Sequence, residues 1–204
     1  FKESSKLVVI IGKILILNTI YILLGSNKND RIQYLLAAKH YLQLEVGEIL
    51  QVSSIYETEP WGNLNQPKYL NQVLELSTSK TPFQLLHILQ KIEKNLGRTN
   101  KQQNAARTID IDILFYEGYI LHAKNLQIPH PRLHLRKFTL QPLMEVNKSY
   151  IHPIFKKTIE ELMGVEGNIR RRYYAAWNVI VNQEIKFEKR VMHPPDNMIN
   201  SLIS

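Results

Sequence analysis

Apolar and polar side chains alternate strictly in the first part of residues 107–115, which read Arg-Thr-Ile-Asp-Ile-Asp-Ile-Leu-Phe. Successive side chains of a β-strand point to opposite faces, so this pattern predicts a half-buried strand over residues 108–116. Its core face is expected to carry Ile109, Ile111, Ile113 and Phe115. Asp110 and Asp112 are then expected on the other face, about 6.5–7 Å apart along the strand. The chain must therefore form a sheet that displays two neighbouring carboxylates.

The rest of the central region predicts more strands and two helices. Strands are expected at residues 19–24, 49–56 and 69–76, because these runs are rich in apolar residues and end at turn residues. One helix is expected after Asp30, and a second between Thr81 and Gly97, where Pro82 and Gln84 complete a capping-box pattern. Several strands are joined by connections too short for a parallel crossover. We therefore predict an α+β sandwich with a mainly antiparallel sheet.

Composition excludes several classes of protein. Apolar residues make up 44% and charged residues 22% of the 204 residues, as in ordinary globular domains. Because cysteine is absent, the chain can form no disulfide scaffold, thiolate zinc site or cysteine nucleophile, which fits a reducing cytoplasm. The net charge of +8 lies largely at the two ends, since residues 20–167 hold 17 basic and 14 acidic side chains. We therefore expect no nucleic-acid partner, which would require basic residues clustered on one face.

Both ends differ from the middle, so we predict three segments. Residues 1–19 form an N-terminal extension, residues 20–165 form the domain, and residues 166–204 form a basic extension of unknown role. The apolar run at residues 7–24 is interrupted by Gly12 and Lys13. A spanning helix needs ~20 apolar residues, and a central Lys costs about 2.5–3.5 kcal/mol, so we expect no membrane span. A signal peptide is an alternative interpretation of this run, although no small-residue cleavage site follows it.

The two carboxylates suit a divalent cation. Mg²⁺ binds through a few carboxylate oxygens together with substrate phosphates, and two metal ions could share such a pair. The alternative is an amphipathic strand whose outer face happens to carry acids. Basic side chains surround the pair in sequence, which favours a polyphosphate site. These side chains are Arg98, Arg107, His130, Arg132 and Arg136. No P-loop motif and no serine nucleophile elbow is present.

A second set of residues could bind a flat ring. It combines aromatic faces, which stack on planar heterocycles, with hydroxyl and amide groups that read a hydrogen-bonding edge. Its members are Thr58, Trp61, Tyr69, Asn71 and Phe138. The alternative interpretation places Tyr69 and Phe138 in the hydrophobic core.

Together, these motifs resemble those of the 6-hydroxymethyl-7,8-dihydropterin pyrophosphokinase family of folate biosynthesis. The resemblance runs from Tyr-Ile-Leu-Leu-Gly-Ser-Asn at residues 21–27 to residues 158–162. It includes the segments 53–62, 66–71, 92–98 and 128–132, and the Arg-Thr-x-Asp-x-Asp block at residues 107–112 is its most specific part. The resemblance implies a ferredoxin-like α/β sandwich and transfer of pyrophosphate from ATP to the pterin's hydroxymethyl group, with release of AMP. It also implies a monomer in the cytoplasm.

The resemblance implies roles for individual residues. Asp110 and Asp112 would hold two Mg²⁺ ions, and together with Arg98 and Arg107 they form the expected catalytic set. The ATP site would comprise Gln90, Glu93, Arg98, Arg107, Ile113, His130 and Arg136. The pterin would lie between Tyr69 and Phe138, with Thr58, Trp61 and Asn71 beside it.

The chain departs from the family pattern in the loop at residues 99–106. This loop lacks the tryptophan and the Gly-Pro that commonly precede the Arg-Thr-x-Asp-x-Asp block, and it has Asn100 where a basic residue is common. We therefore expect a weaker lid and a slower or looser enzyme. An alternative interpretation is a non-catalytic ferredoxin-like module that binds a nucleotide or RNA.

Overall fold

The computed structural model describes residues 6–10, 13–60, 66–98 and 106–164. Trp61, residues 99–105 of the predicted lid and the predicted extension at residues 166–204 lie outside these described residues. Among the described residues, no helix is both long enough and apolar enough to cross a membrane.

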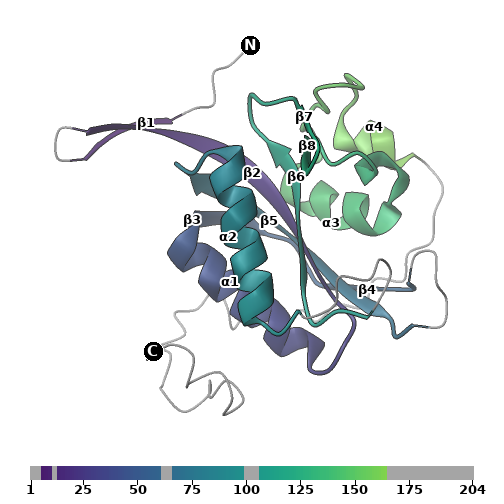
Figure 1. The fold of residues 1–204 in the computed structure, drawn as a ribbon. Helices are drawn as coiled ribbons and strands as arrows, with labels where there is room; N and C mark the ends of the chain where they lie inside the picture. Colours follow the sequence, from purple (N-terminus) through teal and green to yellow (C-terminus); the bar gives the residue numbers. More distant parts are fainter. Residues whose placement is uncertain (1–5, 11–12, 61–65, 99–105, 165–204) are drawn as a thin grey trace, which may run out of the picture. The chain divides into compact units, whose positions relative to one another are not determined.

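Six strands of the described chain form one sheet, in which β2 and β5 are central (Figure 1). β2 pairs with β1, β5 and β6, and β5 also pairs with β3 and β4, always antiparallel. The strands are β1 (Lys6–Ile10), β2 (Lys13–Ser26), β3 (Gly47–Val52), β4 (Tyr56–Thr58), β5 (Tyr69–Thr78) and β6 (Asp110–Tyr116). A separate hairpin consists of β7 (Leu121–Ala123) and β8 (Leu126–Ile128). The prediction of a mainly antiparallel α+β sandwich is confirmed.

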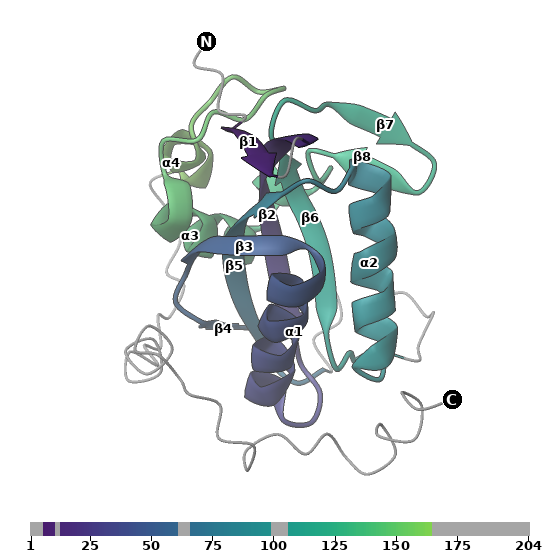
Figure 2. The ribbon, with the colours of Figure 1, turned by 90° about the vertical axis from the view of Figure 1, so that its left-hand side faces the viewer.

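Helices cover both faces of the sheet (Figure 2). α1 (Arg31–Glu45) and α2 (Pro82–Asn95) lie on one face. A short 3-10 helix (Leu133–Leu135), α3 (Lys137–Asn147) and α4 (Ile159–Met163) follow the hairpin, and α3 and α4 lie on the opposite face. The central strands are therefore covered on both faces, and the core residues of β2, β5 and β6 are buried.

The helix starts follow from local side-chain chemistry. The Thr81 hydroxyl accepts a hydrogen bond from the Gln84 amide, and the Gln84 side chain accepts one from the Thr81 amide at 2.9 Å. Asp30 likewise accepts from the Gln33 amide at 3.2 Å. These bonds satisfy amide groups that have no partner within a helix, so both predicted starts are confirmed.

β5 and β6 lie within two residues of their predicted bounds, whereas two other predictions differ more. β2 begins at Lys13, so the predicted boundary at residue 20 falls inside this strand, where Asn18 pairs with Thr78. The strand expected at residues 49–56 is divided into β3 and β4. Between them, the Ser53 hydroxyl accepts a hydrogen bond from the Val73 backbone amide of β5 at 2.9 Å.

A β-bulge in β6 interrupts the predicted alternation of side chains between the two faces of the sheet. Tyr21 pairs with Phe115, whereas the next residue, Ile22, pairs with Ile113, so Leu114 is an extra residue. An extra residue moves every later side chain of a strand to the opposite face. Phe115 therefore packs with Tyr21 beneath α3, at a ring distance of 6.1 Å. The expectation that Phe115 shares a face with Ile113 was wrong.

Candidate functional site

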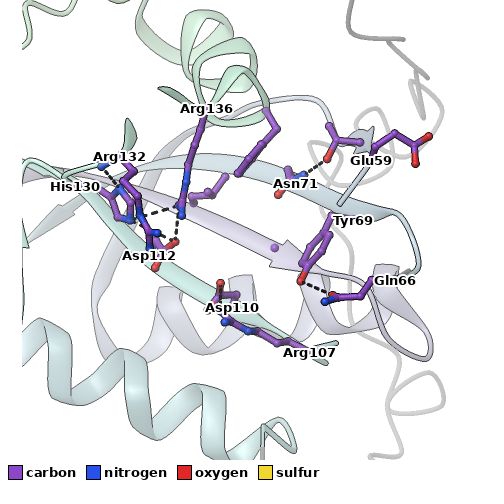
Figure 3. A pocket seen from close by; sticks show the side chains of 14 residues that line it. Glu59, Gln66, Tyr69, Asn71, Arg107, Asp110, Asp112, His130, Arg132 and Arg136 are labelled. Atoms are coloured by element: carbon purple, nitrogen blue, oxygen red, sulfur yellow. Dashed lines mark hydrogen bonds and ion pairs between the residues drawn. The ribbon is translucent and has the colours of Figure 1, made fainter. Parts of the chain in front are cut away.

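A pocket opens at the end of the sheet where β2 ends and β5 and β6 begin. It is bordered by the start of α3 and by the segment after β8 (Figure 3). Its volume is about 240 Å³. The residues that line it are Leu23, Gly25, Thr58, Glu59, Gln66, Tyr69, Asn71, Arg107, Asp110, Asp112, His130, Arg132, Arg136 and Phe138. Figure 3 shows charged residues of β6 and the α3 side on one side of the pocket, and the amide and aromatic residues of β5 on the other.

Asp110 is the first residue of β6 and forms two ion pairs. Its Oδ1 lies 2.8 Å from Arg98 Nη1, and its Oδ2 lies 2.6 Å from Arg107 Nη1. All three side chains are roughly four-fifths buried. The bulge lies further along the strand, so Asp110 and Asp112 share the face expected from the alternation.

Asp112 has looser partners. Its Oδ2 lies 3.8 Å from Arg136 Nη1 and 3.9 Å from His130 Nε2, beyond ordinary hydrogen-bond distance. Burial and the neighbouring Asp110 raise the pKa of Asp112, and Arg136 opposes this change. Ionising both carboxylates is therefore unfavourable, and a cation between them would relieve the repulsion.

His130 is held in one orientation. Its backbone amide donates to the Leu114 carbonyl at 2.9 Å, and its Nδ1 accepts from the Arg132 amide at 3.2 Å. Burial and the nearby Arg136 and Arg132 lower the pKa of His130 to about 4. The ring is therefore neutral at pH 7, and its Nε2 lies 3.5 Å from Arg136 Nη1 and 3.9 Å from Asp112 Oδ2.

Glu93 supports the site from α2. Its Oε1 accepts from the Ile111 amide at 2.8 Å, and its carboxylate pairs with Arg98. Burial raises the pKa of Glu93 to about 7, although Arg98 opposes this change. Glu93 thus connects α2 to β6 and holds the guanidinium of Arg98, which in turn contacts Asp110.

Amide and aromatic groups form the uncharged side of the pocket. Asn71 donates to the Thr58 hydroxyl at 2.8 Å, and the Tyr69 hydroxyl donates to the Gln66 side chain at 3.4 Å. Gly25 lines the pocket beside these groups, where an added Cβ would lie 3.4 Å from Asn71 Oδ1 and 3.9 Å from the Tyr69 ring. Phe138 lies at the start of α3, with the Arg136 guanidinium 5.6 Å from its ring centre.

The structure brings most of the predicted site residues together. Nine of them line the pocket: Thr58, Tyr69, Asn71, Arg107, Asp110, Asp112, His130, Arg136 and Phe138. Arg98 and Glu93 lie behind Asp110, Ile113 is buried in the core, and Gln90 is exposed on α2. Trp61 lies outside the described residues.

Three polar residues of the pocket were absent from the predicted ATP, pterin and metal sets. Glu59 forms an ion pair with Lys68 at 2.6 Å, and Gln66 and Arg132 line the pocket beside Tyr69 and His130. Gln66 and Arg132 lie in Gln-Pro and His-Pro-Arg segments that the resemblance includes. Their position in those motifs is the sequence feature from which they could have been predicted to line the pocket.

Asp110 and Asp112 could hold a divalent cation. Among the described residues, no three His, Asp or Glu side chains gather as a complete ligand set. A pair of carboxylates suits Mg²⁺, which commonly takes one or two carboxylates and completes its shell with water and substrate phosphates.

Two family models match the chain. The model of 7,8-dihydro-6-hydroxymethylpterin-pyrophosphokinase (HPPK) matches residues 21–148, which is more than half of the chain and includes the whole pocket. The model of CRISPR associated protein Cas1 matches residues 121–204. This second match covers less than half of the chain and overlaps the first.

Curated relatives carry names that agree with the first match. The chain is 43% identical over 143 residues to the 2-amino-4-hydroxy-6-hydroxymethyldihydropteridine pyrophosphokinase of Aquifex aeolicus, covering 70% of this chain and 89% of that protein. It is 43% identical over 130 residues to the protein of the same name from Bacillus subtilis, covering 63% and 78%. It also aligns with the folic acid synthesis protein fol1 of Pneumocystis carinii at 40% identity, over 66% of this chain but 18% of that protein.

Solved structures show the same fold. The chain superimposes on Plasmodium falciparum HPPK-DHPS with a TM-score of 0.59 and 20% identity. The match covers 72% of this chain and 41% of that longer chain.

Proposed function

This chain belongs to the 7,8-dihydro-6-hydroxymethylpterin-pyrophosphokinase family, and from that premise we propose that it transfers pyrophosphate from ATP to 6-hydroxymethyl-7,8-dihydropterin. In this reaction the pterin hydroxyl oxygen bonds to the β-phosphorus of ATP. The bond between the β-phosphorus and the bridging α–β oxygen breaks, AMP leaves, and the hydroxyl proton is released. The observation that supports this most strongly is the position of Asp110 and Asp112 among arginines, beside a pocket with aromatic and amide walls.

The chain's own cations would bind the polyphosphate. Arg98 and Arg107 contact Asp110 in this structure. Planar guanidinium groups bind phosphate oxygens as readily as they bind carboxylate oxygens. Arg136 lies near the other carboxylate, with its Nη1 3.8 Å from Asp112 Oδ2. Arginines beside both carboxylates would hold the bound phosphates in line for attack and balance the charge that develops on their oxygens.

Asp110 and Asp112 would hold two Mg²⁺ ions. When bound, Mg²⁺ neutralises phosphate oxygens and lowers the pKa of a coordinated hydroxyl. The residues fit this role because burial, together with the neighbouring Asp110, raises the pKa of Asp112, and a bound cation would offset both effects. The neutral His130 lies beside Asp112 and Arg136, so it would border the metal side of the pocket without adding a charge.

The pterin would occupy the uncharged side of the pocket. Tyr69 and Phe138 provide aromatic faces, and Asn71 and Thr58 provide hydrogen-bonding groups for the edge of the heterocycle. Gly25, which has no side chain, leaves room for the ring beside Asn71 and Tyr69. Trp61, Gln90, Glu93 and Ile113 stay predictions from the resemblance, as do a monomeric state and a cytoplasmic location. The alternative of a non-catalytic binding module is not favoured, because the curated relatives are named as enzymes.

The proposal is tested by Asp110→Asn, with Glu48→Gln as the control. Glu48 is exposed on β3, so both variants lose one negative charge, but only the first loses a candidate metal ligand. Asp110→Asn should reduce Mg²⁺-dependent AMP formation by about 10³-fold or more, the range found when a group that stabilises phosphoryl transfer is removed. Glu48→Gln should retain wild-type activity. Equal activity of the two variants would contradict the proposal.

A further inference from the structure

We propose that Asn27 is a positioning residue, which fixes the separation of the Tyr69 side and the Arg107 side of the pocket. The inference rests on the proposed function for its consequences in catalysis. Asn27 itself does not line the pocket, and its side chain is 1% exposed. It follows Ser26, the last residue of β2, in the Gly-Ser-Asn segment at residues 25–27.

Asn27 binds the segment that precedes β6. Its backbone amide donates to the Arg107 carbonyl at 3.1 Å, and its side-chain Oδ1 accepts from the Arg107 amide at 2.7 Å. This pair of bonds fixes the backbone of Arg107. The Arg107 guanidinium then reaches Asp110 Oδ2 at 2.6 Å. Asn27 therefore fixes the backbone position from which the Arg107 side chain extends to the proposed phosphate side of the pocket.

Asn27 also binds the segment that precedes β5. Its Nδ2 lies 3.1 Å from Gln66 Oε1 and 3.3 Å from the Pro67 carbonyl oxygen, and it donates to both. Gln66 Oε1 in turn accepts from the Tyr69 hydroxyl at 3.4 Å. One amide side chain thus connects the aromatic ring on one side of the pocket to the arginine on the other.

The bonding pattern requires an amide at this position. The Oδ1 acceptor faces an N–H group, and the two Nδ2 hydrogens face two oxygens, so the side chain has a partner for each of its polar groups. Aspartate would keep the acceptor for Arg107 but would place a second oxygen against Gln66 and Pro67. Asn27→Asp should therefore release the Tyr69 side and leave the Arg107 side attached.

Ser26 provides a matched control. Its hydroxyl donates to the Thr108 carbonyl at 2.5 Å, so it attaches the end of β2 to the segment that precedes β6 and has no bond to Gln66 among the described contacts. Ser26→Ala removes a buried hydrogen bond of the same Gly-Ser-Asn segment without touching the bonds of Asn27. Any effect that is shared by the two variants is a loss of stability of this segment, and any effect confined to Asn27→Asp reports the connection to Gln66.

The catalytic test is a double-mutant cycle of Asn27→Asp and Gln66→Met. Each single variant should lower kcat/KM for the pterin, per folded molecule, by about tenfold to a hundredfold, because small displacements of positioned groups have effects of this size. The double variant should lose no more than the worse single variant, since both remove one connection. Ser26→Ala combined with Gln66→Met should instead give the product of the two single effects. The proposal would be overturned if the double variant of Asn27→Asp and Gln66→Met lost the product of the two single effects. An unchanged kcat/KM in Asn27→Asp would also overturn it.

Hydrogen exchange separates failure of this inference from failure of the proposed function. Amide exchange at residues 68–71 should accelerate about tenfold or more in Asn27→Asp and in Gln66→Met, and should stay at the wild-type rate in Ser26→Ala. This result requires no catalysis, so it decides the structural claim even if the wild-type protein forms no AMP. Unchanged exchange in both Asn27→Asp and Gln66→Met would refute the connection. Gln66 is only partly buried, so Gln66→Met keeps the test available if Asn27→Asp does not fold.

Discussion

Replacing Glu93 by glutamine should stabilise the protein relative to the wild type, by an amount that increases as the pH rises. Glu93 is 8% exposed, pairs with Arg98 and accepts from the Ile111 amide. Two effects compete, because burial disfavours the carboxylate and Arg98 favours it. Burial is the larger effect and raises the pKa of Glu93 from 4.5 to about 7. Glutamine keeps an oxygen for Ile111 and removes the buried charge.

The size of the effect follows from the pKa values. A group whose pKa is higher in the folded than in the unfolded state binds more protons when folded, so it loses stability as the pH rises between the two values. Each pH unit corresponds to about 1.4 kcal/mol, so the window from 4.5 to 7 corresponds to at most about 3 kcal/mol. The free energy of unfolding of Glu93→Gln, minus that of the wild type, should therefore increase by up to about 3 kcal/mol across this window and be constant above it.

Urea denaturation at pH 4.5, 5.5, 6.5, 7.5 and 8.5, with EDTA present, measures this difference. Other groups also titrate here, since burial lowers the pKa values of His130 and His152 to about 4, but their contributions cancel when the variant is compared with the wild type. A difference that decreases as the pH rises would show that Arg98 outweighs burial. A difference that does not change with pH would show that the two effects balance, and either result would refute the reasoning.

Three further substitutions test separate parts of the account. Thr81→Ala removes the cap of α2 and should lower the free energy of unfolding by about 1 kcal/mol in urea, whereas no change would show that this cap is unimportant. Phe138→Leu keeps an apolar side chain but removes the aromatic face, so the pterin KM should rise about tenfold with little change in the ATP KM. Asp112→Asn should raise the Mg²⁺ concentration needed for half-maximal AMP formation by about tenfold or more, and an unchanged requirement would remove Asp112 from the metal site.

The sequence predicted those parts of the fold that depend on neighbouring residues. The cap at Thr81 and the placement of Asp110 and Asp112 on one face of β6 each follow from a few consecutive side chains. The bulge at Leu114 could not be predicted in this way, because it is a property of the pairing between β6 and β2. The start of β2 at Lys13 was missed because polar residues interrupt its apolar run.

The same distinction holds for the site. The carboxylates and arginines were found because they cluster in sequence and match the motifs of a family. The role of Asn27 was not predicted, because its partners Gln66 and Arg107 lie 39 and 80 residues away. Its Gly-Ser-Asn segment carries no chemical signal until the fold brings those two segments to it.

The central claim is most directly tested by AMP formation from ATP and Mg²⁺, with and without 6-hydroxymethyl-7,8-dihydropterin. The account predicts AMP that depends on the pterin, that equals the pyrophosphorylated pterin in amount, and that Asp110→Asn nearly abolishes. If folded protein forms no more AMP with the pterin than without it, the account is contradicted.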